Sequence, residues 1–464
     1  MDVPPPEASA PQPNVSSEEM AALPTTKYSL PEELEGLPLD TLASRTFWYS
    51  LANLGYGMFF ALNNATLTLL LKNMGASGVL IGLMGSSHSL EGAVIQPFVG
   101  AASDRLRSPL GRRRPFILAF TPLSTLFLLL TPAASHLPVA IRLGAVVTCI
   151  FLFTVFFNVA QDPYLALMPD IIPPKQRGRV TAMWTFFGVT GQATLVMLNI
   201  PLIMKFSLVG IVMLVTTLLT CAGVRESRHT PENVHRSHMA ELKAALAGLN
   251  TLRQARKSLT ALFFLGMGVG AVLPFLTVFV TKITGCSDHD AEKMFLVLMI
   301  STAVSVLPFG WLCDRLGPKS VLLTALVLIA LAALNGLWVH TLPQVAIVLV
   351  LAGLGNAAQS ASAYPLLTRL VPGDEVGFYT GLQSTALSIA APATAVVTGL
   401  LTDRGGYRLI FVVCGISVGI ALTILAQLRM PDAAHEIQAR QTEIQNESLL
   451  TPSAGRSAEG YTNG

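Results

Sequence analysis

The chain has 464 residues, of which 52% are hydrophobic and only 12% are charged, with a net charge of +3. A soluble domain carries roughly 25% charged residues, so this composition excludes an ordinary water-soluble fold. The small net charge and the scattered basic residues exclude a nucleic-acid-binding surface, and we expect no nucleic-acid partner. The five cysteines form no CxxC pair, which predicts neither a metal site nor a disulfide framework.

Apolar runs of bilayer length recur along the whole chain. A transmembrane helix needs about 20 such residues. Only helices and closed barrels satisfy their backbone hydrogen bonds in lipid, and the runs lack the alternation of barrel strands. We therefore predict an all-α membrane protein with twelve transmembrane helices in two six-helix halves, the spans lying at 48–71, 79–101, 115–132, 140–161, 179–200, 207–223, 259–281, 293–312, 319–339, 343–366, 377–400 and 407–428.

The longest connection inside the chain lies between spans six and seven and carries an amphipathic pattern at Met239–Leu252. The N-terminal segment is polar and rich in Pro and Glu, without the basic and short apolar regions of a signal peptide. We expect both tails to be disordered. The predicted units are an N-terminal tail (1–46), a first half (47–223), a linker (224–258), a second half (259–429) and a C-terminal tail (430–464).

The distribution of basic residues predicts the orientation in the membrane. With an even number of spans both termini lie on one side, and 23 of the 30 Lys and Arg residues fall on that side. The positive-inside rule therefore places both termini in the cytoplasm. We expect an integral protein of the plasma (inner) membrane that acts as a monomer in the lipid bilayer.

Two short sequences repeat six spans apart. The stretch Gly100–Arg105 after span two matches Gly310–Arg315 after span eight, and Asn158-Val-Ala-Gln161 in span four matches Asn356-Ala-Ala-Gln359 in span ten. Such parallel repeats place the solute between the two halves near the bilayer midplane. We expect the amides of spans four and ten to face each other across that cavity.

Two segments carry a family resemblance. The stretch from Gln96 to Ile117, with QP-x-x-G-x-x-S-D-R and GRRRPFI at its ends, resembles the loop between spans two and three of major facilitator superfamily transporters. More narrowly, it resembles the sucrose/proton symporters of the glycoside-pentoside-hexuronide group, and the segment from Asn158 to Asp170 is similar to their N-x-x-Q-G-P-x-R-A-L-x-x-D motif. The resemblance implies a secondary transporter with the major facilitator fold. Asp162 and Leu165 replace the motif's Gly and Arg, and that Arg is associated with proton coupling and sugar binding, so the substrate is not carried over.

The resemblance also implies a cytoplasmic gate. In the family the loop Asp, here Asp104, lies against the N-terminus of span eleven, near Gly377, where the helix dipole favours an anion. The loop arginines would then lie near Asp170. The alternative is that these charges only set the topology. The predicted gate comprises Asp104, Arg105, Arg112, Arg113, Asp170, Arg179, Asp314 and Arg315.

Glu91 lies near the centre of span two, with His88 three residues earlier on the same helical face. A charged carboxylate there costs about 3 kcal/mol on insertion scales, so we expect it to be protonated or partnered. We predict a role in proton or cation coupling, and a structural hydrogen bond to His88 or a neighbouring helix is the alternative. The full set of predicted substrate-binding or coupling residues is Glu91, His88, Asn63, Asn64, Asn158, Gln161, Asp162, Gln192, Asn356, Gln359 and Gln383; individually, each Asn or Gln is more often helix-to-helix glue.

The central parts of the predicted spans contain no Lys or Arg, which argues against an anionic solute and favours a neutral sugar or glycoside. No nucleophile elbow, Walker loop or metal-ligand spacing occurs, so we predict no enzyme activity and no cofactor. The predicted function is proton- or cation-coupled symport of a small solute by alternating access. The alternatives are a proton-coupled exporter of amphipathic compounds and a non-transporting membrane receptor or scaffold of the same fold.

Overall fold

The computed structural model describes residues 39–106, 108–173, 177–224, 253–371 and 376–430, together with the backbone but not the side chains of a few further helical positions. The helix predicted at Met239–Leu252 and most of both predicted tails lie outside the described residues. The first helix begins at Leu39, ahead of the predicted start of the first half at 47, because hydropathy registers only the apolar part of a helix.

The described chain is helical throughout, as predicted. The first half contains α2 (Leu39–Ala61), the π-helical turn η2 (Leu62–Thr66), α3 (Leu67–Asn73), α4 (Gly78–Arg105), α5 (Arg114–Ser135), α6 (Val139–Ile171), α7 (Arg177–Met197) and α8 (Leu202–Gly223). The second half contains α10 (Arg253–Val272), the 3₁₀ turn η4 (Leu273–Phe275), α11 (Leu276–Thr284), α12 (Asp288–Leu316), α13 (Pro318–Gly336), α14 (Leu342–Thr368), α15 (Val376–Gly405) and α16 (Leu409–Ala426).

The prediction of twelve spans is confirmed. α2, η2 and α3 follow one another without a break and form one span, as do α10, η4 and α11. In the described part of the chain, eleven helical segments are long and apolar enough to cross a membrane, and α7, which is more polar, supplies the twelfth. The chain is thus a multi-pass integral membrane protein.

The internal repeat extends to the turns that start the second span of each half. Gly75 and Gly285 have φ angles of 82° and 68°, which residues with a side chain rarely adopt. Two residues later, Ser77 and Ser287 cap the N-termini of α4 and α12 by accepting backbone hydrogen bonds. Glycine and serine at this spacing therefore end one span and begin the next in both halves.

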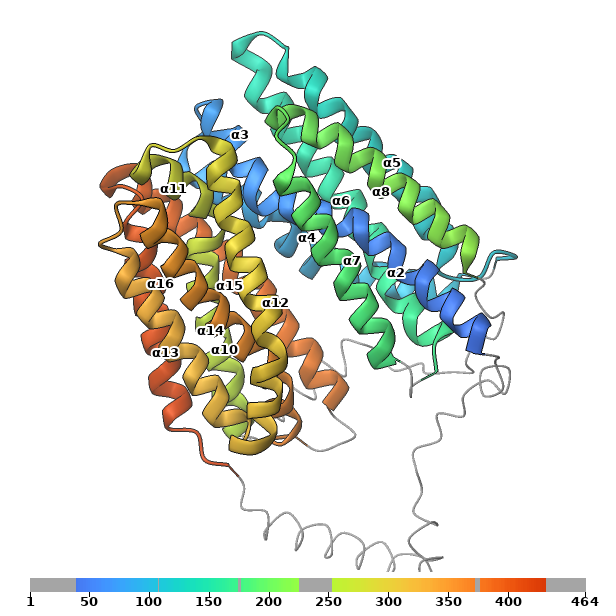
Figure 1. The fold of residues 1–464 in the computed structure, drawn as a ribbon. Helices are drawn as coiled ribbons and strands as arrows, with labels where there is room; N and C mark the ends of the chain where they lie inside the picture. The colour runs from blue at the N-terminus through green and yellow to red at the C-terminus, as the bar shows by residue number, and fades with distance from the viewer. Residues whose placement is uncertain (1–38, 107, 174–176, 225–252, 372–375, 431–464) are drawn as a thin grey trace, which may run out of the picture.

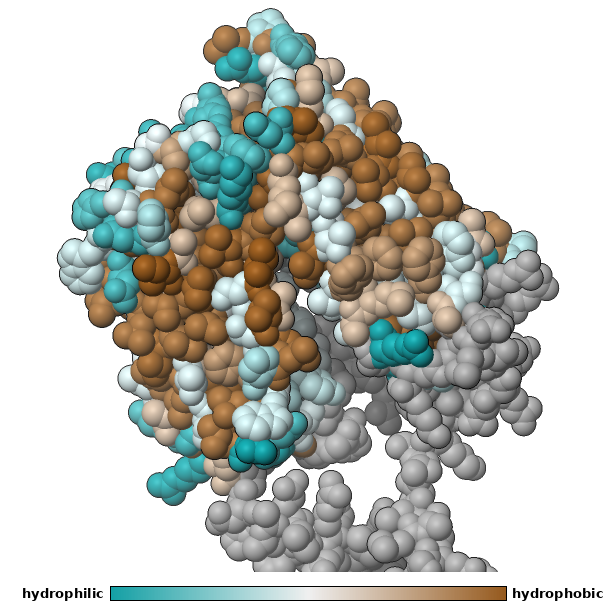
Figure 2. All heavy atoms as spheres, in the orientation of Figure 1, coloured by the Kyte–Doolittle hydropathy of each residue, from teal (hydrophilic) through white to brown (hydrophobic). Residues whose placement is uncertain are grey.

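The two halves meet at one end of the molecule and diverge toward the other. In Figure 1 the first half, in blue to green, and the second half, in yellow to red, approach each other near α3 and α11 and separate below. We call the end with the turns 74–77 and 285–287 the closed end, and the end with the loop 106–113 the open end. Figure 2 shows a hollow between the halves on the open side.

Hydrophobic side chains cover the flanks of both halves, and hydrophilic ones gather toward the ends (Figure 2). On α16, Val412, Ile416 and Ile420 are exposed at intervals of four residues and so form one stripe of the helix. The same pattern of large exposed apolar residues occurs on α5, α8 and α13. Because such surface is unfavourable in water, these faces fit the hydrocarbon core of a bilayer.

Glycines let helices from the two halves touch backbone to backbone at the closed end. A Cβ atom on Gly78 of α4 would lie 2.7 Å from the carbonyl oxygen of Gly399 on α15, and one on Gly399 would lie 2.5 Å from that of Gly78. The backbone nitrogen of Gly78 also donates to Asp403 on α15 at 2.7 Å. The closed end is therefore a tightly packed joint between the halves.

Candidate functional site

Glu91 is buried in α4, and its carboxylate has no hydrogen-bond partner among the described residues. Only 9% of the residue is exposed, and neither carboxylate oxygen accepts a hydrogen bond from the residues that the structure describes. The Thr154 hydroxyl lies close to Glu91 but donates to the carbonyls of Ile150 and Phe151 in its own helix. An intramembrane carboxylate is costly unless it is protonated or neutralised, so this arrangement suits a group that exchanges a proton or a cation.

His88 lies on the same helix one turn away, but its ring packs among aromatic side chains. The ring centroids of Phe59, Phe60 and Phe157 lie 5.4, 5.5 and 5.3 Å from that of His88, in edge-to-face arrangements. No hydrogen bond joins His88 to Glu91, and Nδ1 of His88 has no partner in the described part of the chain. The aromatic packing thus accounts for the surroundings of the His88 ring, and the structure does not show the hydrogen bond to His88 that was the alternative to a coupling role for Glu91.

Two asparagines join neighbouring segments to the part of α4 that precedes Glu91. Asn63, in the π-helical turn η2, donates to the carbonyl of Gly85 at 3.0 Å, and Asn158 on α6 donates to that of His88 at 3.3 Å. Their own amide oxygens are buried and accept no hydrogen bond from any described residue. With Glu91, three segments thus supply buried acceptor oxygens, which suits a hydroxyl-bearing solute or a cation. π-Helical turns are frequent at functional sites.

The other predicted site residues of the first half are more dispersed. Gln161 is buried at 6% exposure, and Asp162 beside it is half-buried, with Oδ2 3.4 Å from where a Cβ on Gly100 would stand. Asn64 donates to a carbonyl of its own helix. Gln192 is half-buried on α7. Among the described residues, no three His, Cys, Asp or Glu side chains gather closely enough to hold a metal ion.

Of the predicted amide side chains in the second half, two have buried oxygens without a hydrogen bond to the described residues, and one is hydrogen-bonded beside an apolar cavity. Gln359 on α14 and Gln383 on α15 each have a buried side-chain oxygen that no described residue contacts by a hydrogen bond. Asn356 donates to the Thr302 hydroxyl in the same half at 3.4 Å. It lines an apolar cavity of about 140 Å³ inside the second half, between α10, α12, α13, α14 and α16.

At the open end, the loop after α4 is tied to α6 by two arginines that share one carboxylate. Arg112 donates to Asp170 through Nε and Nη2, at 3.3 and 2.7 Å, and Nε of Arg113 donates to the same carboxylate at 3.2 Å. Arg113 also donates to the Ser103 hydroxyl at 3.0 Å. Gly111, with φ of 99°, turns the loop into this position. These contacts lie wholly within the first half.

Replacing Asp170 with asparagine should lower the thermal stability of the purified protein. The change leaves two partly buried guanidinium groups without their shared anion, which we expect to cost about 2 kcal/mol, since hydrogen bonds to charged groups contribute in that range. Thermal unfolding in detergent measures the loss. The matched control is Asp314→Asn, at the repeated Asp-Arg motif, whose acid is exposed; equal losses in both variants would contradict the assignment.

The predicted contact across the halves at the open end lies outside the described residues. The side chains of Asp104 and Arg105, and those of residues 376–378 at the start of α15, are not described. The role of Asp104 in the cytoplasmic gate remains a prediction.

The second Asp-Arg motif is arranged differently from the first. Asp314 is exposed at the end of α12, and the Arg315 guanidinium stacks 3.9 Å above the centroid of Trp311 in the same helix. Arg179 is exposed near the start of α7, and none of the described acids forms an ion pair with it. Among the described residues of the second half, the sequence repeat therefore does not extend to an arginine cluster on a carboxylate.

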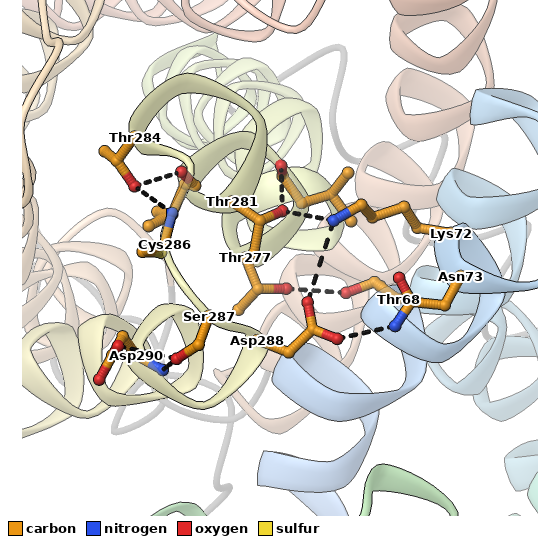
Figure 3. Close-up of polar contacts among 12 residues, drawn as sticks. Thr68, Lys72, Asn73, Thr277, Thr281, Thr284, Cys286, Ser287, Asp288 and Asp290 are labelled. Carbon is orange, nitrogen blue, oxygen red and sulfur yellow. Dashed lines mark hydrogen bonds and ion pairs between the residues drawn. The ribbon is translucent and has the colours of Figure 1, made fainter.

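A polar network at the closed end, which the sequence did not predict as a site, joins the halves (Figure 3). Lys72 of α3 donates to the Thr281 hydroxyl of α11 at 2.8 Å and lies 3.9 Å from the Asp288 carboxylate of α12. Asn73 donates to the same carboxylate at 2.7 Å. All three contacts connect the first half to the second.

An ion pair beneath this network is fully buried. Nζ of Lys205 on α8 lies 2.5 Å from Oε2 of Glu292 on α12, and each side chain is 1% exposed. The Thr66 hydroxyl in η2 donates to the other oxygen of Glu292 at 2.5 Å. Thr68 and Thr277 add a hydroxyl contact of 3.0 Å between the halves.

Lys205 corrects the prediction that basic residues lie outside the spans. Span six was predicted from 207 and span eight from 293, but α8 begins at Leu202 and α12 at Asp288, so both charges lie on helices and inside the protein. The sequence did contain a signal for this ion pair, because a basic and an acidic residue lie at the corresponding ends of two spans in different halves. A buried lysine with its own carboxylate partner is nevertheless not a free site for an anionic solute.

The arrangement of two six-helix halves is shared with a large superfamily of membrane proteins. A model of the Major Facilitator Superfamily matches residues 49–261 and again 258–455, so the two matches meet where the two halves meet. The chain belongs to the Major Facilitator Superfamily. The inward-open structure of the xylose transporter XylE from E. coli has this superfamily fold too, with a TM-score of 0.64 and 12% identity, covering 84% of this chain and 97% of that one.

Relatives within the Major Facilitator Superfamily match over shorter stretches. A multidrug resistance protein MdtG of Serratia proteamaculans is 30% identical over 167 residues, 35% of this chain and 39% of the relative. A mouse protein named proton-associated sugar transporter A is 30% identical over 153 residues, 30% of this chain and 20% of the relative. The matched stretches thus span less than half the length of these curated relatives. The narrower resemblance to sucrose/proton symporters is not confirmed by these comparisons.

Proposed function

We propose that this protein is a secondary transporter that moves a small neutral solute, a sugar or glycoside, together with a proton or another cation. The observation that carries the proposal is the pairing of two features. The halves are joined by polar contacts at the closed end, and a buried, unpartnered carboxylate lies in the first half. A scaffold needs neither a joint that can open nor an intramembrane acid.

Alternating access gives both features a role. With the predicted orientation, the closed end faces away from the cytoplasm and the hollow between the halves opens toward it. Glu91 with the amides of Asn63 and Asn158 would bind the coupling ion and solute hydroxyls from the first half. The buried oxygens of Gln359 and Gln383 would bind the solute from the second half.

Two relatives favour different solutes. The mouse relative is named as a proton-associated sugar transporter, which supports a sugar. The bacterial relatives are named as multidrug resistance proteins, which supports a proton-coupled exporter of amphipathic compounds as the second candidate. We favour the sugar, because the unpaired side-chain oxygens on both halves suit hydroxyl groups better than apolar surfaces.

The experiment is uptake into proteoliposomes that contain the purified full-length chain. Labelled neutral sugars and a labelled lipophilic cation are offered in parallel, with and without an imposed inward proton gradient and with a protonophore. Sugar accumulation that the protonophore abolishes is the expected result. Movement of the lipophilic cation alone would replace the sugar with the exporter function, and no movement of either by folded protein would overturn the transporter proposal.

A further inference from the structure

The Lys205–Glu292 ion pair differs from the rest of the closed end in its burial. The Lys72 and Asp288 side chains above it are 21% and 31% exposed, whereas those of Lys205 and Glu292 are each 1% exposed. The pair also joins α8 of the first half to α12 of the second, so the closed end cannot open without separating it. Beyond these partners, the Thr66 hydroxyl donates to Glu292, and Nδ1 of His289 lies 3.9 Å from it.

A buried ion pair has an unusual energy balance. Taking two charges out of water costs several kcal/mol for each ion, and their attraction inside the protein roughly repays that cost. Opening the closed end would return both charges to water together. The intact pair therefore adds little to the closed state over the open one, and the end can open.

Losing one charge changes this balance. A single charge left in the closed end keeps its cost of burial and loses its partner, so closure becomes unfavourable. Two apolar side chains of similar size remove that cost altogether, and opening then exposes apolar surface to water.

We infer that Lys205 and Glu292 are positioning residues that set the equilibrium between the closed and open forms of this end, acting as a matched pair of charges. The inference rests on the proposed alternating access, but not on the identity of the solute. It predicts that the two single substitutions and the double substitution have opposite effects. A merely structural contact would instead weaken closure in all three variants.

The test measures the distance across the closed end directly. Spin labels are attached at Leu137→Cys and His340→Cys, two exposed positions in the α5–α6 and α13–α14 turns of opposite halves. The partly exposed Cys149 and Cys286 are replaced by serine in this background. Pulsed electron paramagnetic resonance then reports the distances in nanodiscs, without solute or gradient, so failure of the sugar proposal leaves this result interpretable.

The variants Lys205→Met and Glu292→Gln should each shift the population toward long distances, by about a hundredfold in the open-to-closed ratio. The double variant Lys205→Met/Glu292→Leu should return the population to short distances. The same variant should exchange solute more slowly than the wild type. The charge-swapped variant Lys205→Glu/Glu292→Lys should approach the wild-type distribution. An exposed control pair on the same helix, Asp290→Asn/Lys293→Met, should shift nothing.

Size-exclusion profiles and thermal unfolding show whether each variant is folded. If folded single variants keep the wild-type distances, or if the double variant opens as the singles do, the inference is overturned. If the single variants do not fold, the charge-swapped variant decides: a folded protein with wild-type distances supports the matched pair, and one with the open distribution overturns it.

Discussion

Replacing Gly191 with valine should prevent α2 and α7 from packing and cause a large loss of folded protein. A Cβ on Gly191 would lie 2.1 Å from the carbonyl oxygen of Leu54, and one on Gly57 would lie 2.1 Å from that of Gly188. Both contacts are with backbone, so no side chain can rotate away. Small residues at such crossings allow the close approach that stabilises membrane helices.

We expect Gly191→Val to cost about 3 kcal/mol or more, at the upper end of the range for overpacked positions, because the helix itself must shift. Yield, size-exclusion profile and thermal unfolding of the purified protein measure the effect. The matched control is Gly144→Val on α6, where an added Cβ meets nothing within 4 Å. Similar behaviour of the two variants would show that the crossing tolerates separation.

Glu91→Gln should abolish accumulation of solute above equilibrium while solute still crosses the membrane down its own gradient. Glutamine keeps the size and the acceptor oxygen of glutamate but cannot exchange a proton or carry a negative charge. Because the Glu91 carboxylate has no partner among the described residues, removing its charge breaks no ion pair there, and the fold should survive. The expected loss is therefore in coupling and not in stability.

The measurement compares gradient-driven uptake with solute counterflow in proteoliposomes. Asp162→Asn is tested in parallel, because this second intramembrane acid lies near the open end of α6. Asp314→Asn, at an exposed acid, serves as the control. Unchanged accumulation in Glu91→Gln together with loss in Asp162→Asn would move the coupling role to Asp162, and unchanged accumulation in both would remove proton coupling through either acid.

The closed-end network shows why local sequence patterns missed part of the candidate site. Hydropathy averaged over one span is lowered by a charged residue such as Lys205 or Glu292. The average takes no account of a partner charge that lies elsewhere in the sequence. The two residues are 87 positions apart and come from different halves. Only the contact between α8 and α12 in the folded protein shows that each charge is neutralised by the other, which is why the predicted spans stopped short of both residues.

His88 illustrates a second limit of prediction from the sequence. Its spacing from Glu91 correctly places the two on one side of α4, because helical geometry is local. The direction of the ring depends on Phe59 and Phe157, which belong to α2 and α6. Contacts between helices, and not the spacing along α4, therefore determine what surrounds the ring.

The sequence by itself determined the membrane location, the twelve helices and the two repeated halves, because span length, apolarity and repeat spacing are properties of short segments. It also indicated Glu91, since an acid in an apolar run is conspicuous without any structure. Tertiary structure alone decided which end of the molecule is closed and that Lys205 and Glu292 form a buried ion pair there. The physical reason is that the cost of a buried charge depends on its partner, and the fold brings that partner from the other half.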